Sequence, residues 1–344
     1  MRPISAPDSV SLAIQRTKEF LFQPFRWGTY LKLGLVAIIT EGIGSNLHSS
    51  ANNGTSSGNV PMIHSPFDIS PAWIAAILAA VLVLIVLSIV VFYLITRLRF
   101  AFFHCLIHNT SEIRPGWQLY RTQAMRFFWL NLGVGFSYLL LLVLAALPFV
   151  AGFMKLYHET PPGGHPDIGL LLALILPLIP VFLLLMLIAF ALDVILRDWM
   201  LPHYALEDAT AGEAWQEVWE RITAEKGQFA VYALLRLILP IVASIGLLIV
   251  LLIPGLMLAG AGAAIGYAIH SAFADATGAA MVAGILIQVF FGVIAFGFAL
   301  LAGICLGGPL STGLREYALA FYGGRYQALG EILYPAPPPI ATVV

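Results

Sequence analysis

The chain has 344 residues, of which 60% are hydrophobic and only 10% are charged. Soluble proteins carry roughly 25% charged residues, so this composition excludes an ordinary soluble globular protein. The formal net charge of −1 excludes a strongly basic protein that attracts nucleic acid, and the two cysteines, Cys105 and Cys305, indicate no disulfide framework.

The N-terminal segment predicts a helix that lies along a membrane surface. Apolar residues of 9–22 recur at helical spacing, with Arg16 and Glu19 among the polar residues of the other side. Pro24 ends the pattern. No apolar stretch closely follows Arg2, so the sequence predicts no signal peptide.

The first two predicted membrane spans enclose a polar outer loop. Span 1 covers about 27–47 and is the weakest, because Lys32 lies at its base and Glu41 lies well inside it. Residues 48–70 are rich in Ser, Asn and Gly, a composition that cannot bury a core, so we expect a flexible loop. Span 2, over 72–96, is a continuous apolar run long enough to cross a hydrocarbon core of about 30 Å.

The next two spans follow a connection, 97–126, that mixes aromatic and basic residues. Span 3 is predicted over 127–153, and the Pro and Gly content of 154–167 predicts an outer turn. Span 4 covers 168–196 and contains two prolines, which remove backbone hydrogen bonds and tend to kink a helix.

The last two spans follow a second surface segment, 197–228. Within it, Thr210 and Glu213 have the spacing of a capping box, which predicts the start of a surface helix. Span 5 is predicted over 229–257 and span 6 over 281–306. The segment between these spans is rich in Gly and Ala, and we expect it to be either re-entrant or a surface helix.

The positive charges predict the orientation of the six spans. All but one of the 17 Lys and Arg residues fall on alternate connections, and only Lys155 falls on the other side. Cytoplasmic loops carry this excess because translocating cations is unfavourable, so both termini are predicted to be cytoplasmic. The residues of the inner side are Arg2, Arg16, Lys18, Arg26, Lys32, Arg97, Arg99, Arg114, Arg121, Arg126, Arg197, Arg221, Lys226, Arg236, Arg315 and Arg325.

The whole pattern predicts an all-α integral membrane protein with six transmembrane helices in three hairpins and interfacial amphipathic helices on the cytoplasmic side. A single membrane domain covers 1–334, and the Pro-rich tail 335–344 is expected to be disordered. The order of surface helix, span and span recurs over 9–99, 100–197 and 198–325, which suggests an internal repeat. Three unrelated hairpins are an equal alternative, because basic and aromatic residues mark every membrane interface.

Three ionisable residues of the spans are the candidate functional residues: Glu41, Asp193 and Arg236. Ionisable side chains inside a membrane are costly and often mark transport pathways or structural pairs. Similar depths predict an ion pair between Asp193 of span 4 and Arg236 of span 5. Glu41 is the strongest candidate for function, and the alternative is that span 1 ends early and leaves this carboxylate at the outer interface.

Two other patterns are weaker signals. His104, His108 and Glu112 have a spacing that places them on one face of a helix, where they can bind a divalent metal. Polar contacts with water and headgroups are the commoner role of such residues, so no metal or other cofactor is predicted. The small-residue motifs that begin at Gly262 and Gly303 allow close helix approach, which we expect within one subunit.

Several stretches carry a resemblance to a known family. They are AIQRTKEFLFQPFRWGTYLKLGLVA (13–37), TRLRFAFFHCLIHN (96–109) with PGW (115–117), and LRDWMLPHYALEDATAGEAWQEVW (196–219). They resemble an uncharacterised bacterial family of polytopic membrane proteins with a domain of unknown function. A weaker likeness is to the membrane domain attached to some glycerophosphodiester phosphodiesterases. The resemblance implies six spans in a bacterial inner membrane and brings no catalytic residues.

The sequence favours a non-catalytic membrane scaffold or partner-binding protein, because Trp-containing surface helices are prominent and buried polar groups are scarce. A transporter or channel for a small or lipidic molecule is the alternative, supported by the prolines of the spans and by Glu41. An intramembrane enzyme is the least supported class, since no hydrolase, metalloprotease or nucleotide-binding motif is present. The predicted surroundings are the lipid bilayer of the bacterial cytoplasmic membrane and a membrane-protein partner or second copy, without nucleic acid.

Overall fold

The computed structural model describes residues 4–42, 71–159, 168–273 and 278–335, and every element of these residues is a helix. The predicted outer loop 48–70 and most of the loop 154–167 and of the tail 335–344 lie outside the described residues. The shorter elements are α1 (Asp8–Phe22), α2 (Trp27–Ala37), α5 (Ile113–Leu119), α8 (Leu201–Leu206), α9 (Ala211–Ala224) and α12 (Gln327–Leu333), with two π-helical segments, η1 (Ile38–Gly42) and η3 (Ile195–Met200).

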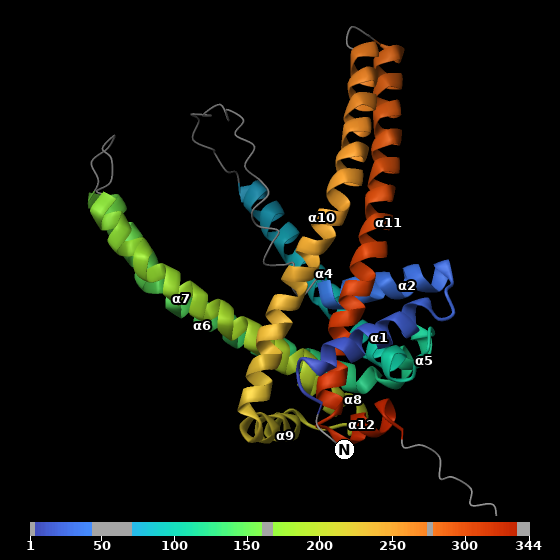
Figure 1. Ribbon diagram of the computed structural model, residues 1–344. Helices are drawn as coiled ribbons and strands as arrows, with labels where there is room; N and C mark the ends of the chain where they lie inside the picture. The colour runs from blue at the N-terminus through green and yellow to red at the C-terminus, as the bar shows by residue number, and fades with distance from the viewer. Residues whose placement is uncertain (1–3, 43–70, 160–167, 274–277, 336–344) are drawn as a thin grey trace, which may run out of the picture. The chain divides into compact units, whose positions relative to one another are not determined.

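Five helices are long and apolar enough to cross a membrane, in agreement with predicted spans 2 to 6. Long runs of Leu, Ile, Val, Phe and Ala form these helices, and the prolines inside four of them do not end the helix. The longest elements in Figure 1 are these helices: α4 (Pro71–Ile107), α6 (Arg121–Glu159), α7 (Ile168–Val194), α10 (Lys226–Ala272) and α11 (Ala279–Gly323).

The first predicted span is too short within the described residues to count as a sixth crossing. α2 has 11 residues and continues into the 5 residues of η1, which end at Gly42. A helix needs about 20 apolar residues to cross the hydrocarbon core. The remainder of the predicted span, 43–47, lies outside the described residues. The six-span count therefore stays a prediction.

The described chain divides into two compact units, each assembled from distant parts of the sequence. Unit 1 combines residues 1–67, 102–113 and 227–324, so it holds α1, α2, α10 and α11. Unit 2 holds the first part of α4 and the helices α6, α7, α8, α9 and α12. This division into units does not test the predicted internal repeat, which stays a prediction.

In unit 1, α2 packs closely on α11 through glycines. A Cβ atom added to Gly308 would lie 2.7 Å from the Cα of Gly34, and one added to Gly307 would lie 3.1 Å from the Ile38 side chain. The backbones approach because neither Gly34 nor Gly308 has a side chain. In the predicted motif that begins at Gly303, Gly307 makes a close contact, but the Cβ position of Gly303 has nothing within 4 Å. In the other predicted motif, the Cβ positions of Gly262 and Gly266 both have nothing within 4 Å.

Also in unit 1, α10 and α11 run side by side in opposite directions (Figure 1). Aromatic rings join them: Tyr232 stacks on Tyr317 at 4.9 Å and on Phe321 at 4.4 Å between ring centroids. α10 has 47 residues, and at a rise of 1.5 Å per residue this is about 70 Å, more than twice a core of ~30 Å. The Gly- and Ala-rich residues 258–272 continue α10. Neither the re-entrant segment nor the separate surface helix is found there.

In unit 2, burial concentrates at the ends of the candidate spans that carry the basic residues. The rings of Phe100 and Phe127 lie 5.5 Å apart, and Phe127 contacts Tyr204 at 5.2 Å. All three are almost fully buried. The apolar windows of the five candidate spans, by contrast, contain no buried residue within the described chain. The packed part of unit 2 therefore lies at the basic ends of its spans.

Candidate functional site

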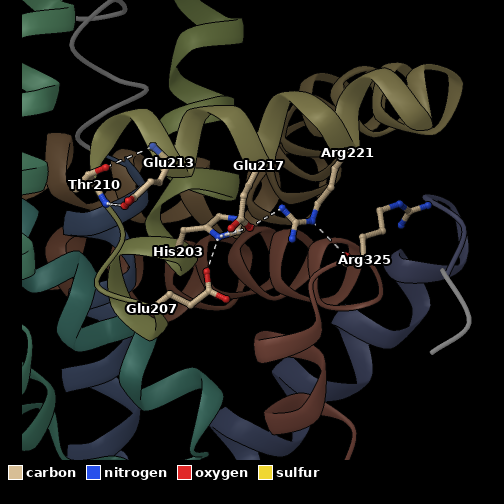
Figure 2. A network of polar contacts seen from close by, with 7 residues as sticks. All are labelled: His203, Glu207, Thr210, Glu213, Glu217, Arg221 and Arg325. Carbon is tan, nitrogen blue, oxygen red and sulfur yellow. Dashed lines mark hydrogen bonds and ion pairs between the residues drawn. The ribbon is translucent and has the colours of Figure 1, made fainter.

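A network of polar side chains in unit 2 begins at a tight corner between two short helices (Figure 2). α8 follows η3 directly and ends at Leu206. Asp208 then adopts a φ of 52°, the left-handed conformation that Asp tolerates better than most residues. Thr210 has extended dihedral angles and starts α9 as its N-cap. The corner places the second turn of α9 against α8.

The predicted capping box is confirmed. The Glu213 backbone N–H donates to the Thr210 hydroxyl at 3.4 Å, and the Thr210 backbone N–H donates to the Glu213 carboxylate at 2.8 Å. The hydrogen bond from the Thr210 backbone, followed by that of its side chain, lowers the pKa of Glu213. The carboxylate therefore favours the folded corner above its unfolded pKa, and this contribution is lost as the pH falls through the lowered, folded pKa.

We expect Thr210→Ala to lower the free energy of unfolding by about 1 kcal/mol, the usual cost of removing an N-cap hydroxyl. Thermal unfolding of the detergent-solubilised protein measures this difference. Thr223→Ala is a matched control, because the Thr223 hydroxyl donates within the exposed last turn of the same helix. Equal stabilities of the two variants would contradict the proposed importance of the cap.

His203 lies at the centre of the network. Its Nδ1 atom is 3.3 Å from the nearer carboxylate oxygen of Glu207 and 3.4 Å from that of Glu217. The imidazole is fully buried, whereas both carboxylates are partly exposed. One face of the imidazole rests on the Tyr326 ring, with 4.1 Å between centroids. α8, α9 and the chain just before α12 thus meet at one histidine.

Arg221 of α9 also contacts the chain just before α12. Its guanidinium pairs with Glu217, one turn away on the same helix, at 3.0 Å, and donates to the backbone oxygen of Arg325 at 3.4 Å. It also lies over the Tyr326 ring, 5.3 Å from the centroid. Arg325 in turn pairs with Glu225 at 2.8 Å. We call α8, α9 and residues 325–333, joined by these contacts, the inner platform, after the side of the membrane on which the charge pattern predicts them.

Two indole rings cover the outward side of the inner platform. Trp215 and Trp219, one turn apart on α9, stack with 5.9 Å between centroids and 12° between planes. They are 43% and 52% exposed. α9 instead packs on the protein through Ala214 and Val218, which are buried. Val218 thus faces the protein, and Trp215 faces outward.

The candidate residues of the spans have partners that differ from the predicted ones. Arg236 pairs with Glu41 at 3.1 Å, and both side chains are about 95% buried or more. Asp193 pairs with Arg197 at 3.5 Å, one turn along its own helical segment. Each of these residues has an ion-pair partner within its own unit, and the predicted ion pair between Asp193 and Arg236 stays a prediction. Glu41 belongs to η1, which continues α2, so the packing of this segment within unit 1 brings a carboxylate to Arg236.

Glu41 is buried within unit 1, with 5% of its surface exposed. The alternative that span 1 ends early stays open, because the described helix ends at Gly42. Glu41 lies in the π-helical segment η1. Single π-helical turns inside α-helices are frequent at functional sites. The buried ion pair between Glu41 of this segment and Arg236 of α10 keeps both residues as candidates for function.

His104 and His108 lie side by side as predicted, with 4.5 Å between ring centroids, but Glu112 does not share their helical face. α4 ends at Ile107, and Asn109 takes a φ of 50°, so that the Thr110 backbone N–H donates back to the Cys105 carbonyl. This Schellman-type end turns the chain away before Glu112. The residues that sequence reasoning missed are His203, Glu207 and Glu217. Their signal was the i,i+4 spacing of His203 and Glu207 just before a capping box.

The chain matches a known protein family over almost its whole length. A family model described as "Family of unknown function (DUF7544)" matches residues 4–332. This confirms the predicted membership of a family of unknown function. No curated protein and no solved structure matches the chain. The bacterial origin and the likeness to the phosphodiesterase membrane domain stay predictions.

Proposed function

The chain belongs to the family of unknown function DUF7544, and from this premise we propose that it is a partner-binding scaffold of the bacterial cytoplasmic membrane. In this proposal it is multi-pass, with six spans in hairpins and both termini in the cytoplasm. Its surroundings are the lipid bilayer, and its partner is another membrane protein or a second copy of the chain. The proposal assigns it no catalytic step.

The observation that carries the proposal is the stacked pair of Trp215 and Trp219 on the inner platform. Both rings are about half exposed although the helix beneath them is held by a capping box, by an ion pair and by contacts to residues 325–326. Trp is the residue type most enriched among interface residues that dominate binding energy. A rigid support reduces the entropy that is lost when a partner binds such rings.

The candidate spans support the same proposal. Their apolar windows contain no buried residue in the described chain, so their side chains are available to lipid or to the helices of a partner. The basic ends of the spans, where the platform lies, are well packed. We therefore place the interaction surface at the cytoplasmic ends and the lipid contact along the spans.

Photo-crosslinking in cells tests the scaffold. A benzophenone amino acid replaces Trp215 or Trp219, and Glu220, exposed on another face of α9, is the matched control position. We expect a discrete protein adduct from positions 215 and 219 and none from 220. Adducts with lipid alone at 215 and 219, or the same protein adduct from 220, would refute the scaffold proposal.

The proposed topology has its own test. Cysteines introduced at Ser57 and Gly163, both outside the described residues, should react with a membrane-impermeant maleimide added to intact cells. A cysteine at Glu217 should not react until the cells are opened. Labelling of position 217 in sealed cells would reverse the proposed orientation, because the basic residues would then lie outside.

A transporter is the second candidate function, and the Glu41–Arg236 pair within a π-helical segment favours it. The test is the reactivity of a cysteine at Thr40, which is fully buried next to Glu41. A small, charged thiol reagent reaches this position only along a water-filled path. Leu248→Cys, on a lipid-exposed turn of α10, is the control. Reaction at position 40 but not at 248 would support transport, and no reaction at 40 would remove its main support.

A further inference from the structure

We propose that His203, Glu207 and Glu217 bind a divalent transition-metal ion of the Zn²⁺ class. The three side chains offer one imidazole nitrogen and two carboxylate oxygens, and these ligand atoms all lie within 4.8 Å of one another. They come from α8 and from the second turn of α9, which the corner at Asp208 and Thr210 brings together. In Figure 2 both carboxylates point toward the imidazole.

The distances fit a tetrahedral ion. Zn²⁺ lies about 2.0–2.1 Å from nitrogen and oxygen ligands, so two ligands of a tetrahedron are roughly 3.3–3.4 Å apart. The Nδ1 atom of His203 is 3.3 Å from Glu207 and 3.4 Å from Glu217. The two carboxylate oxygens reach the same tetrahedral spacing when the partly exposed side chains of Glu207 and Glu217 rotate. A water molecule would complete four-fold coordination.

A protonated histidine that bridges two carboxylates is the competing account. Charge-assisted N–H···O bonds are usually about 2.7–2.9 Å long, and one Nδ1–H can point at only one oxygen. Here two carboxylates share the same nitrogen at longer distances of 3.3 and 3.4 Å. An ion between the three groups satisfies both contacts at once, whereas a single proton does not.

The charges and the chemistry of the ligands select the ion. The two negative charges of the carboxylates offset the two positive charges of a divalent ion, and the imidazole binds in its neutral form. The positive charge of Arg221 lies beside this balanced group. An imidazole ligand favours Zn²⁺ and similar ions over Mg²⁺ and Ca²⁺, which prefer oxygen ligands alone. Arg221 donates to Glu217 Oε2 at 3.0 Å, and this is also the oxygen nearest His203 Nδ1. A carboxylate has about four lone-pair positions on its two oxygens, so Glu217 can accept this hydrogen bond and bind an ion at the same time.

The surroundings hold the ligands in place. His203 is fully buried and its ring rests on Tyr326, which fixes the ring plane. Arg221 orients Glu217, as partners behind a metal ligand commonly do. An ion at this position would join α8 to α9 and stiffen the inner platform. The site stands on its own geometry and does not require the scaffold function.

Metal content of the full-length protein, purified in detergent, tests the site. After EDTA treatment and dialysis against Zn²⁺, mass spectrometry should find one bound Zn²⁺ per chain, and Co²⁺ should give the visible absorption of a tetrahedral complex. Zn²⁺ should raise the midpoint of thermal unfolding, whereas Mg²⁺ should not. Absence of stoichiometric Zn²⁺ uptake by the wild type would overturn the proposal.

Variants distinguish metal binding at this site from metal binding at other histidines. Glu207→Gln alters a partly exposed side chain and should keep the fold, as judged by size-exclusion chromatography, yet lose the bound Zn²⁺ and the Co²⁺ spectrum. His203→Gln and Glu217→Gln should do the same. His108→Gln removes an exposed histidine of α4's end and should retain one equivalent. Full binding by folded Glu207→Gln, or loss of binding in His108→Gln, would overturn the assignment. Neither result would alter the crosslinking test of the scaffold.

Discussion

Glu41→Gln is expected to lower the free energy of unfolding by about 3–5 kcal/mol, the range found when one partner of a buried ion pair is removed. The Arg236 guanidinium, 5% exposed, would lose the carboxylate that lies 3.1 Å away. Arg236→Gln should cost a similar amount for the converse reason. Equilibrium unfolding of the solubilised protein in mixed micelles measures each variant.

The double variant distinguishes a pair from two independent residues. Glu41→Gln combined with Arg236→Gln should be clearly more stable than the sum of the single losses predicts, because no buried charge is left facing a neutral side chain. Asp193→Asn is the matched control: its carboxylate is 45% exposed and pairs with Arg197 along the same segment. We expect a loss of about 1 kcal/mol or less there. Additive losses at 41 and 236 would show that the pair contributes nothing.

Gly308→Ala is expected to have the second-largest effect, a loss of about 1–3 kcal/mol from overpacking. The added methyl group would lie 2.7 Å from the Cα of Gly34, which is backbone and cannot rotate away. α2 must therefore move from α11, and the ion pair made by Glu41 at the end of the same segment should weaken with it. The measurement is the same unfolding experiment.

Gly303→Ala is the control for this prediction. It lies on the same helix, but its Cβ position has nothing within 4 Å. The substitution should be neutral or stabilise by up to about 1 kcal/mol, because Ala favours a helix over Gly. If Gly303→Ala and Gly308→Ala were equally stable, the close approach of α2 to α11 would be wrong.

The sequence by itself determined the features that depend on neighbouring residues. The helical class and five of the predicted spans follow from long apolar runs. The capping box of Thr210 and the pair of Glu217 with Arg221 follow from spacings of three and four residues. These contacts form in any helix, because its geometry places such residues side by side. Orientation and the internal repeat rest on the sequence alone and stay predictions.

Only the tertiary structure decided which distant residues meet. Glu41 and Arg236 are separated by 195 positions, and nothing in either segment indicates the other. Asp193, predicted from its depth to pair with Arg236, pairs with Arg197, one turn along its own segment. Depth and spacing give the position of a residue along its own helix. Which other helix it faces depends on packing, such as the glycine contact of α2 with α11, and on where each helix ends. That information is spread over the whole chain, so local patterns do not contain it.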